Sequence, residues 1–387
     1  MKKTILLASL FTSMAGSQMF GQMLTKEDSL AAGLIASKAS TVLSGYGNVQ
    51  YSNNLTTKEA TTNVDRLVLF VGHKFTSKLS FFSELEVEDV KIAGGESGGE
   101  FALEQAFIKF DINRNNYISA GLIIPRIGII NENHLPTTFN GNARTKVETH
   151  IIPATWREIG IAYYGTSTRM PGLNYSFALL NGLNSADFNT DEGIREGRYE
   201  GANANANCLA ATGALLYYVK HFRIQASAYV GGSNTLSKFH SDSLGIAKNV
   251  FGAPVQLLEC DVQYRNKGLQ IKALGTVTNI SDAEKLNAFY GNNMAQNMIG
   301  YYGEIGYNLN WKKEKAVIIF SRYENLRMTA KMTSNAVYSD ASNMQFITSG
   351  ISYLPHQGVS VKLDYTYKID GSNYAQNSIN VGLGYSY

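Results

Sequence analysis

Hydrophobic and polar residues alternate with a period of two along most of the chain, most clearly at its end. Single polar or glycine residues separate Ile379, Val381, Leu383, Tyr385 and Tyr387. Successive side chains of a β-strand point to opposite faces. The pattern therefore predicts a strand with one apolar face and one polar or small face.

The polar faces of the predicted strands carry charges of both signs. Lys362 and Asp364, for example, alternate with the apolar residues Val361, Leu363 and Tyr365. A charged residue at every second position cannot face lipid, so we expect these faces to line a water-filled interior. The charged residues predicted on this inner wall are Glu84, Glu86, Glu88, Arg223, Glu304, Lys362 and Asp364.

About sixteen such segments follow one another, an even number within the range of bacterial single-chain barrels. Short and long connections alternate between them, as in barrels with tight periplasmic turns and longer external loops. The sequence therefore predicts an all-β fold, a transmembrane antiparallel β-barrel over residues 43–387. The expected strands start near Leu43, Val64, Leu79, Phe101, Tyr117, Arg157, Leu173, Gly213, Phe222, Val255, Leu269, Ile299, Ala316, Gln345, Val359 and Asn377.

The first residues predict export from the cytoplasm. Two lysines precede the apolar stretch 5–11 and a run of small residues, which is the layout of a secretory signal peptide. We expect residues 1–22 to be removed and residues 23–42 to form a periplasmic lead, with a short helix. Together with the barrel pattern, this predicts a protein embedded in the lipid bilayer of the outer membrane.

Composition supports the membrane barrel over a soluble β-sandwich, which the alternation also fits. Charged residues make up 17% of the chain, against roughly 25% in globular proteins. The 23 Tyr and 18 Phe suit the aromatic girdles of a membrane barrel. A formal net charge of only +3 argues against a nucleic-acid partner. Cys208 and Cys260 are expected to be free thiols, since the inferred strand order places them two strands apart.

Residues 125–156 form the third long connection and differ from an exposed loop. Connections of this length without a strand are uncommon unless they have a function or are disordered. Its prolines stiffen it and its isoleucines need a wall to pack against, so we predict an inward-folded third external loop that narrows the pore. Charges at such a narrowing set ion preference. The predicted constriction residues are Arg126, Arg144, Lys146, Glu148 and His150.

An alternative for these constriction charges stays open. They are equally expected to pair with wall residues such as Glu84 or Glu86 and to hold the loop in place. The row Glu84, Glu86 and Glu88 is interpreted as a cation-attracting stripe or divalent-ion site, or, as we favour, as an inner wall that is solvated or paired with arginine.

No motif indicates catalysis or a bound cofactor. The six histidines show no spacing that suggests a catalytic set. The glycine-rich piece 94–99 lacks the Lys-Ser/Thr ending of a phosphate-binding loop, and it is interpreted as a flexible external loop. We therefore expect no enzyme activity, no cofactor and no fixed metal site.

Four stretches of the chain resemble bacterial porins of the phosphate-selective porin O/P family: 104–110, 121–126, 136–141 and 151–160. The resemblance implies a sixteen-stranded barrel, often trimeric, whose third external loop folds inward. Phosphate-preferring members line the pore with arginines and lysines, whereas the inner face predicted here is mixed in sign. The final strand, with Tyr385 and Tyr387, also resembles the signal that the barrel assembly machinery recognises.

These observations predict a porin, a water-filled channel for small hydrophilic solutes and ions with mild anion preference. The expected partners are the lipid bilayer, the barrel assembly machinery, the permeating solutes or anions, and two further copies of the chain in a homotrimer. The alternative is a barrel that anchors adhesive or partner-binding external loops. The acidic connection that holds Asp187, Asp191, Glu192, Glu196 and Glu200 keeps this alternative open.

Overall fold

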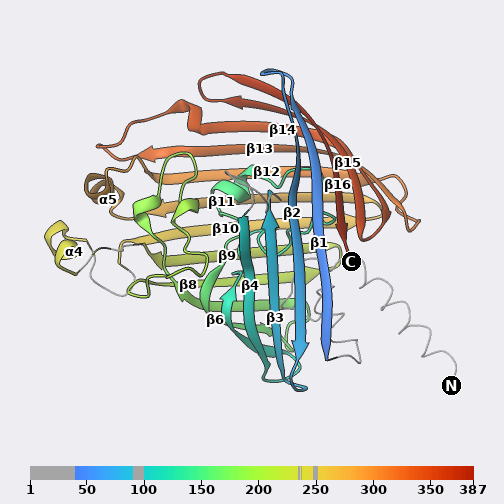
Figure 1. Ribbon diagram of the computed structural model, residues 1–387, viewed down its shortest axis with the longest axis horizontal. Coiled ribbons are helices and arrows are strands. Elements are labelled where there is room, and N and C mark those ends of the chain that lie inside the picture. The colour runs from blue at the N-terminus through green and yellow to red at the C-terminus, as the bar shows by residue number, and fades with distance from the viewer. Residues whose placement is uncertain (1–39, 90–99, 234–235, 237, 247–251) are drawn as a thin grey trace, which may run out of the picture.

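The computed structural model describes residues 40–89, 100–233, 236, 238–246 and 252–387. The predicted signal peptide, nearly all of the predicted lead and the glycine-rich piece 94–99 lie outside the described residues. Sixteen antiparallel strands form one closed barrel (Figure 1), which confirms the predicted fold class and strand number. No helix among the described residues is long and apolar enough to cross a bilayer.

The strands are β1 (Thr41–Asn54), β2 (Glu59–Lys74), β3 (Leu79–Glu88), β4 (Glu100–Asp111), β5 (Asn116–Ile123), β6 (Glu158–Thr166), β7 (Leu173–Asn181), β8 (Leu209–Val219), β9 (Phe222–Gly232), β10 (Pro254–Asn266), β11 (Leu269–Ile280), β12 (Ala295–Asn308), β13 (Ala316–Met332), β14 (Asn343–His356), β15 (Val359–Asp370) and β16 (Ala375–Ser386). Short helices lie in the connections: α3 (Lys146–His150), α4 (Lys238–Leu244), α5 (Ala283–Tyr290) and the 3₁₀ turns η1 (Ser185–Asp187), η2 (Arg195–Gly197) and η3 (Asp340–Ser342).

Each strand pairs with its neighbours in sequence, and β1 pairs with β16 to close the sheet. The backbone N–H of Tyr387 donates to the carbonyl of Gly45 at 2.9 Å, so the last residue extends the closing ladder. Closure leaves no free strand edge. The alternating final segment therefore ends the barrel by pairing with the first strand.

The two ends of the barrel differ in their connections. At one end the strands are joined by turns such as 220–221, 267–268 and 357–358. The other end carries the long connections, including 124–157 and 182–208. The alternation is not strict, however, because the tight connection 55–58 lies at the long-loop end.

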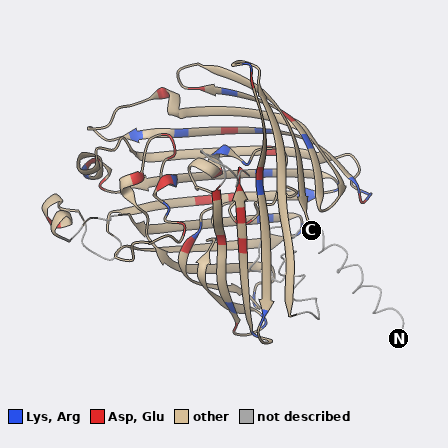
Figure 2. Cartoon of the chain, viewed as in Figure 1, with Lys and Arg blue, Asp and Glu red and all other residues tan. Residues whose placement is uncertain are grey.

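The two faces of the sheet are separated as predicted. On β15, Val361 and Leu363 are 42% and 50% exposed, whereas Lys362 and Asp364 between them are each 3% exposed. The apolar set faces outward and the charged set faces inward, and Figure 2 shows charged positions of both signs along the strands. Cys208, which is buried, and Cys260 on β10, which is exposed, do not form a disulfide with each other.

Candidate functional site

Segment 124–157, which joins β5 to β6 and includes α3, packs against the inner face of the barrel. Its Ile127, Ile151 and Ile152 are fully buried. They belong to the same apolar cluster as Phe82 on β3 and Leu257 on β10. Burying these side chains stabilises the segment by roughly 1.5–3 kcal/mol each. These isoleucines therefore pack together with apolar side chains of the barrel strands.

Hydrogen bonds join this segment to strands on opposite sides of the barrel. Nε2 of His134 lies 2.9 Å from the hydroxyl of Tyr46 on β1. The side chain of Gln225 on β9 donates to the carbonyl of Gly128 at 3.0 Å. Strands β1 and β9 lie half-way round the closed sheet from one another. The segment thus reaches inward-facing side chains from both sides.

Glycines on the inner wall provide room where the segment comes closest. A Cβ at Gly382 on β16 would lie 2.1 Å from Oδ1 of Asn142. A Cβ at Gly300 on β12 would lie 2.5 Å from Cδ1 of Ile151. Both distances are far below van der Waals contact, so a larger residue would push the segment away from the wall.

Glu148 of α3 is fully buried and holds the segment together. Its Oε2 accepts hydrogen bonds from the backbone N–H groups of Ile129 and Ile130 at 2.8 and 2.6 Å. Its Oε1 accepts from the hydroxyls of Tyr302 and Thr145 at 2.7 and 3.2 Å. Burial raises the pKa of Glu148, and the hydrogen bond from Ile130 opposes this shift. The carboxylate acts as an internal anchor and does not face an aqueous path.

The guanidinium of Arg126 also has its partner within the segment. Its Nε lies 3.0 Å from a carboxylate oxygen of Glu132, and both side chains are almost completely buried. Burial lowers the pKa of Arg126 and the charge of Glu132 opposes this, leaving the pKa raised. This buried pair serves to fix the local conformation.

His150 ends α3 with its Nδ1 3.1 Å from the carbonyl of Lys146. Burial and the nearby positive charges of Lys146 and Arg195 lower the pKa of His150 to about 4. Glu192 lies 4.0 Å away and is too exposed to reverse this effect. His150 is therefore neutral at neutral pH.

Arg144 and Lys146 are the predicted constriction residues whose charged groups make no hydrogen bond or salt bridge to another described side chain. Burial, and then the charge of Arg66, lower the pKa of Arg144 to about 10. Burial also lowers the pKa of Lys146, while Glu324 opposes that shift. Both groups line a cavity between the segment and the wall.

Three acids of the wall bind the segment through its polar groups. Asp364 accepts hydrogen bonds from the backbone N–H and side-chain amide of Asn142 at 2.7 and 2.6 Å. Glu304 accepts from the side chain of Asn140 at 3.0 Å. Glu324 accepts from the backbone N–H of Lys146 at 2.5 Å. The wall therefore holds the segment mainly through bonds from neutral amides to carboxylates.

The remaining predicted wall residues also point inward and are engaged. Glu86 and Glu88 pair with Arg66 at 3.1 and 3.2 Å, which matches the favoured interpretation of an arginine-paired wall. Glu84 accepts from the side chain of Gln105 at 3.1 Å. Arg223 pairs with Asp261 at 2.8 Å. The ammonium group of Lys362 donates to the carbonyls of Phe139 and Gly141, both at 2.8 Å.

Connection 182–208 covers the segment from the long-loop end. Arg195 donates to the carbonyls of Thr149 and Ala154 at 3.0 and 2.8 Å. Arg198 and Arg157 both pair with Glu200, at 2.7 and 2.5 Å. Part of the acidic connection that suggested an adhesive loop is thus used inside the protein.

One group of described residues has the chemistry of a metal site. Single ligand atoms of Glu84, Glu104 and His134 lie within 4.8 Å of one another, and all three residues are buried. The hydroxyl of Tyr46 bridges two of them, because it donates to Glu104 at 2.9 Å and lies 2.9 Å from Nε2 of His134. These contacts already form a complete hydrogen-bonded link between β1, β4 and the segment.

Two cavities flank the segment. The long-loop cavity, of about 250 Å³, lies between the segment and strands β13 to β16 and β1, and it contains Arg144, Lys146 and Lys368. The short-turn cavity, of about 300 Å³, contains Arg265, Lys220 and Lys362 and opens beside the turn 220–221. Each cavity is lined both by the segment and by the barrel wall.

Sequence reasoning missed several residues of this site. Arg322 and Glu324 lie on the buried face of β13, and Arg265 is at the end of β10, in step with the inward residues Asp261 and Gln263. The period-two alternation, extended through these strands, was the signal that would have found them.

Comparisons with known proteins agree on the fold. No protein-family model matches the chain. An uncharacterised protein of Aquifex aeolicus is 29% identical over 337 residues, which are 84% of this chain and 74% of that protein. Membership of the phosphate-selective porin O/P family therefore stays a prediction.

Solved structures of outer-membrane channels are similar over most of the chain. OmpF of Salmonella typhi has a TM-score of 0.58 at 12% identity and covers 90% of this chain and 97% of its own. An anion-selective porin from Comamonas acidovorans has a TM-score of 0.56 at 12% identity, covering 90% and 99%. The channel DcaP of Acinetobacter baumannii has a TM-score of 0.56 at 12% identity, covering 91% and 99%.

Identities this low show a shared fold, which is that of bacterial porins. A closed barrel satisfies every backbone group of its strands, and an apolar outer face suits lipid. With these structural neighbours, the closed sheet and its apolar exterior indicate a location in the outer membrane.

Proposed function

We propose that this barrel is a porin, a water-filled channel through which small hydrophilic solutes and ions diffuse, with a mild preference for anions. Segment 124–157 is its constriction. A solute that enters from outside passes through the long-loop cavity, crosses the constriction and leaves through the short-turn cavity. The long-loop end faces the cell exterior in this proposal, and the short turns face the periplasm. The fold supports the proposal, since charged side chains lie on the inner face of the strands and cavities lie on both sides of the segment.

The proposed anion preference rests on a difference between the acids and the bases that line the cavities: the acids already have partners in the protein, whereas several of the bases do not. The acids that line them are Glu132, Glu324 and Asp364, and each accepts hydrogen bonds or a salt bridge from the protein. Among the described residues, the basic groups that line the cavities without a hydrogen bond or salt bridge of their own are Arg144, Lys146, Lys220, Arg265 and Lys368.

This difference matters because a permeating ion interacts with groups that can reorient toward it. A carboxylate that already accepts two or three hydrogen bonds has at least half of its roughly four acceptor sites occupied, which leaves fewer for a cation. An unpaired guanidinium or ammonium group keeps its donors available for an anion. Conduction also requires weak binding, and the bound acids reduce the positive field, so the preference is expected to be mild.

The rest of the proposal concerns export and assembly. Residues 1–22 direct secretion and residues 23–42 form a periplasmic lead. The outward residues of the final strand, including Tyr385 and Tyr387, serve as the signal for the barrel assembly machinery, and the mature protein forms a homotrimer. Arg126 and Glu148 support the constriction by fixing its conformation, whereas Arg144 and Lys146 face the solute.

Planar bilayers test the function directly. Purified, heat-modifiable protein should produce ohmic conductance steps, and its reversal potential in a potassium chloride gradient should lie on the chloride side. The shift should be larger at low salt, because screening is weaker there. Correctly folded protein that never conducts would exclude a channel. A reversal potential on the potassium side would leave the channel in place and exclude the anion preference.

A further inference from the structure

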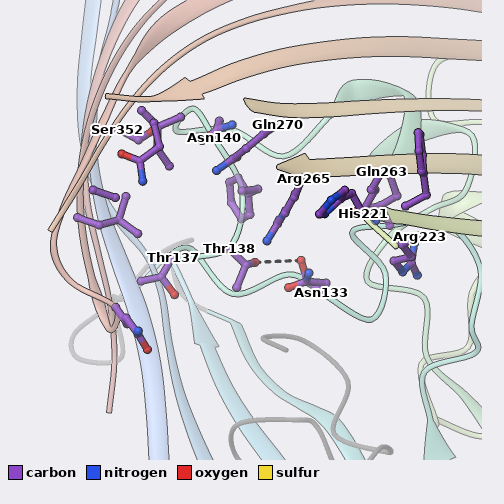
Figure 3. A pocket seen from close by; sticks show the side chains of 18 of the residues that line it. Asn133, Thr137, Thr138, Asn140, His221, Arg223, Gln263, Arg265, Gln270 and Ser352 are labelled. Atoms are coloured by element: carbon purple, nitrogen blue, oxygen red, sulfur yellow. Dashed lines mark hydrogen bonds between the residues drawn. The ribbon is translucent and has the colours of Figure 1, made fainter. Parts of the chain in front are cut away.

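The short-turn cavity combines a free cationic group with several unused hydrogen-bonding groups. Arg265 of β10 points into it, and Figure 3 shows this side chain reaching toward Thr138 of segment 124–157. The guanidinium of Arg265 makes no hydrogen bond or salt bridge to another described residue. Its fork of N–H donors matches the geometry of a carboxylate.

The acid–base balance of this cavity favours an anion. Among the described residues that line it, Glu132 is the acid, and its carboxylate is paired with Arg126 at 3.0 Å. Lys220 and His221 lie at the rim, in the turn between β8 and β9. A negatively charged group that enters therefore meets Arg265 without a competing free carboxylate from the lining.

The cavity also offers neutral groups that recognise hydroxyls. Three residues that line it each have a buried atom without a hydrogen-bond partner among the described residues: Oδ1 of Asn133, Oγ1 of Thr137 and Oγ of Ser352. Ser352 is only 1% exposed. Buried polar atoms of native proteins nearly always have a partner. Three such atoms beside one cavity leave hydrogen-bonding capacity that the hydroxyl groups of a ligand would satisfy.

The geometry points to a binding site for a small hydroxylated carboxylic acid in the short-turn cavity, with Arg265 holding the carboxylate and the amides and hydroxyls of the wall and segment holding its hydroxyl groups. This rests on the proposed function, because the ligand is a solute passing through the same channel. A volume of about 300 Å³ lies at the lower end of small-molecule sites, which suits an acid of this size.

Gluconate, glucose and inorganic phosphate serve as probes in single-channel recordings in potassium chloride. Gluconate carries both the carboxylate and the hydroxyls, glucose lacks the charge and phosphate lacks the carbon-bound hydroxyls. We expect gluconate to reduce the current in a saturable manner. Glucose and phosphate should require about tenfold higher concentrations, since each loses one class of hydrogen bond.

Two variants separate this site from general effects of charge. Arg265→Gln should raise the half-blocking concentration of gluconate about tenfold while the channel still conducts. Arg114→Gln removes the same charge from an exposed turn at the same end of the barrel and should leave the block unchanged. Heat-modifiable migration of both variants shows that the barrel has folded.

A third variant tests the hydroxyl contacts. Ser352→Ala should weaken the block by gluconate more than the block by acetate, which has a carboxylate and no hydroxyl group. Equal block by gluconate and phosphate, or an unchanged block in Arg265→Gln, would overturn the site while the conductance steps still support the channel. A wild-type protein that does not conduct would overturn the channel itself, so the two failures are distinguishable.

Discussion

The hydroxyl of Tyr302 on β12 donates a 2.7 Å hydrogen bond to the buried carboxylate of Glu148, which links α3 to the barrel wall. The same carboxylate accepts from two backbone N–H groups of the segment. One side chain thus fixes both the internal shape of the segment and its distance from β12. The first prediction tests this anchor.

Glu148→Ala should loosen the constriction without unfolding the barrel. Each buried donor left without its acceptor costs about 1–3 kcal/mol, so the anchored conformation should lose several kcal/mol. We expect a higher mean conductance with more current noise. Thr149→Ala, at the adjacent position of α3, provides the control. Conductance and noise identical to wild type would show that Glu148 does not set the aperture.

The unbound ammonium groups of the long-loop cavity should determine ion preference. The double variant Lys146→Glu with Lys368→Glu introduces two negative charges beside the long-loop cavity. Its reversal potential should move toward the potassium side, more at low salt than at high salt. Lys58→Glu changes the same charge in an exposed turn at the same end and should have little effect. If both variants behave alike, these lysines do not line the conducting path.

Acidification should destabilise the region around His150. Burial and nearby cations lower its pKa from 6.5 to about 4 in the folded protein, so the unfolded chain binds a proton first as the pH falls. The stability is therefore full above about pH 6.5 and is lost between pH 6.5 and pH 4, by about 2 kcal/mol at pH 5.

Unfolding in urea at pH 7 and pH 5 measures this effect. His150→Gln cannot take up the proton and should lose less stability than wild type over the same interval. His221→Gln, at an exposed turn, is the matched control and should follow wild type. An equal pH dependence of wild type and His150→Gln would contradict the assignment.

Removal of Tyr385 to Tyr387 should impair assembly. The backbone of Tyr387 exchanges hydrogen bonds with Gly45 at 2.9 and 3.1 Å. The ring of Tyr385 lies over Gly47, where an added Cβ would come within 2.6 Å of its hydroxyl. The deletion therefore removes both ladder bonds and the aromatic cover of the closing pair. The level of heat-modifiable protein in outer-membrane fractions should fall, and an unchanged level would refute this role.

The alternation of residues was sufficient to predict the barrel because the side-chain period of a strand is fixed by its geometry. The expected starts at Leu79, Phe222, Leu269 and Val359 coincide with the observed ones, since tight turns mark them. Starts at the long-loop end were less accurate. Strand β2 begins at Glu59 rather than near Val64. Its first residues are mostly polar and do not alternate with apolar ones, so the period-two pattern did not reveal them.

The roles of the charged residues were harder to predict. Arg144 and Glu148 lie four positions apart in one charged run. The guanidinium of Arg144 has no hydrogen-bond or salt-bridge partner among the described residues, whereas the carboxylate of Glu148 is an anchor. Their difference depends on Tyr302, more than a hundred positions later in the chain. Contacts between side chains so far apart in the sequence follow from barrel closure and strand register. The local spacing of residues does not predict them.

Attachment of segment 124–157 to β1 and β9 also has a mechanical consequence. A bilayer presses sideways on an embedded cylinder, and a thin-walled cylinder filled only with water flattens easily. A segment bonded to opposite walls resists flattening, because flattening would change the distance between β1 and β9. That change would stretch or compress the segment and its hydrogen bonds. The residues that we propose to narrow the channel would thus also keep its width constant when the surrounding membrane changes thickness or tension.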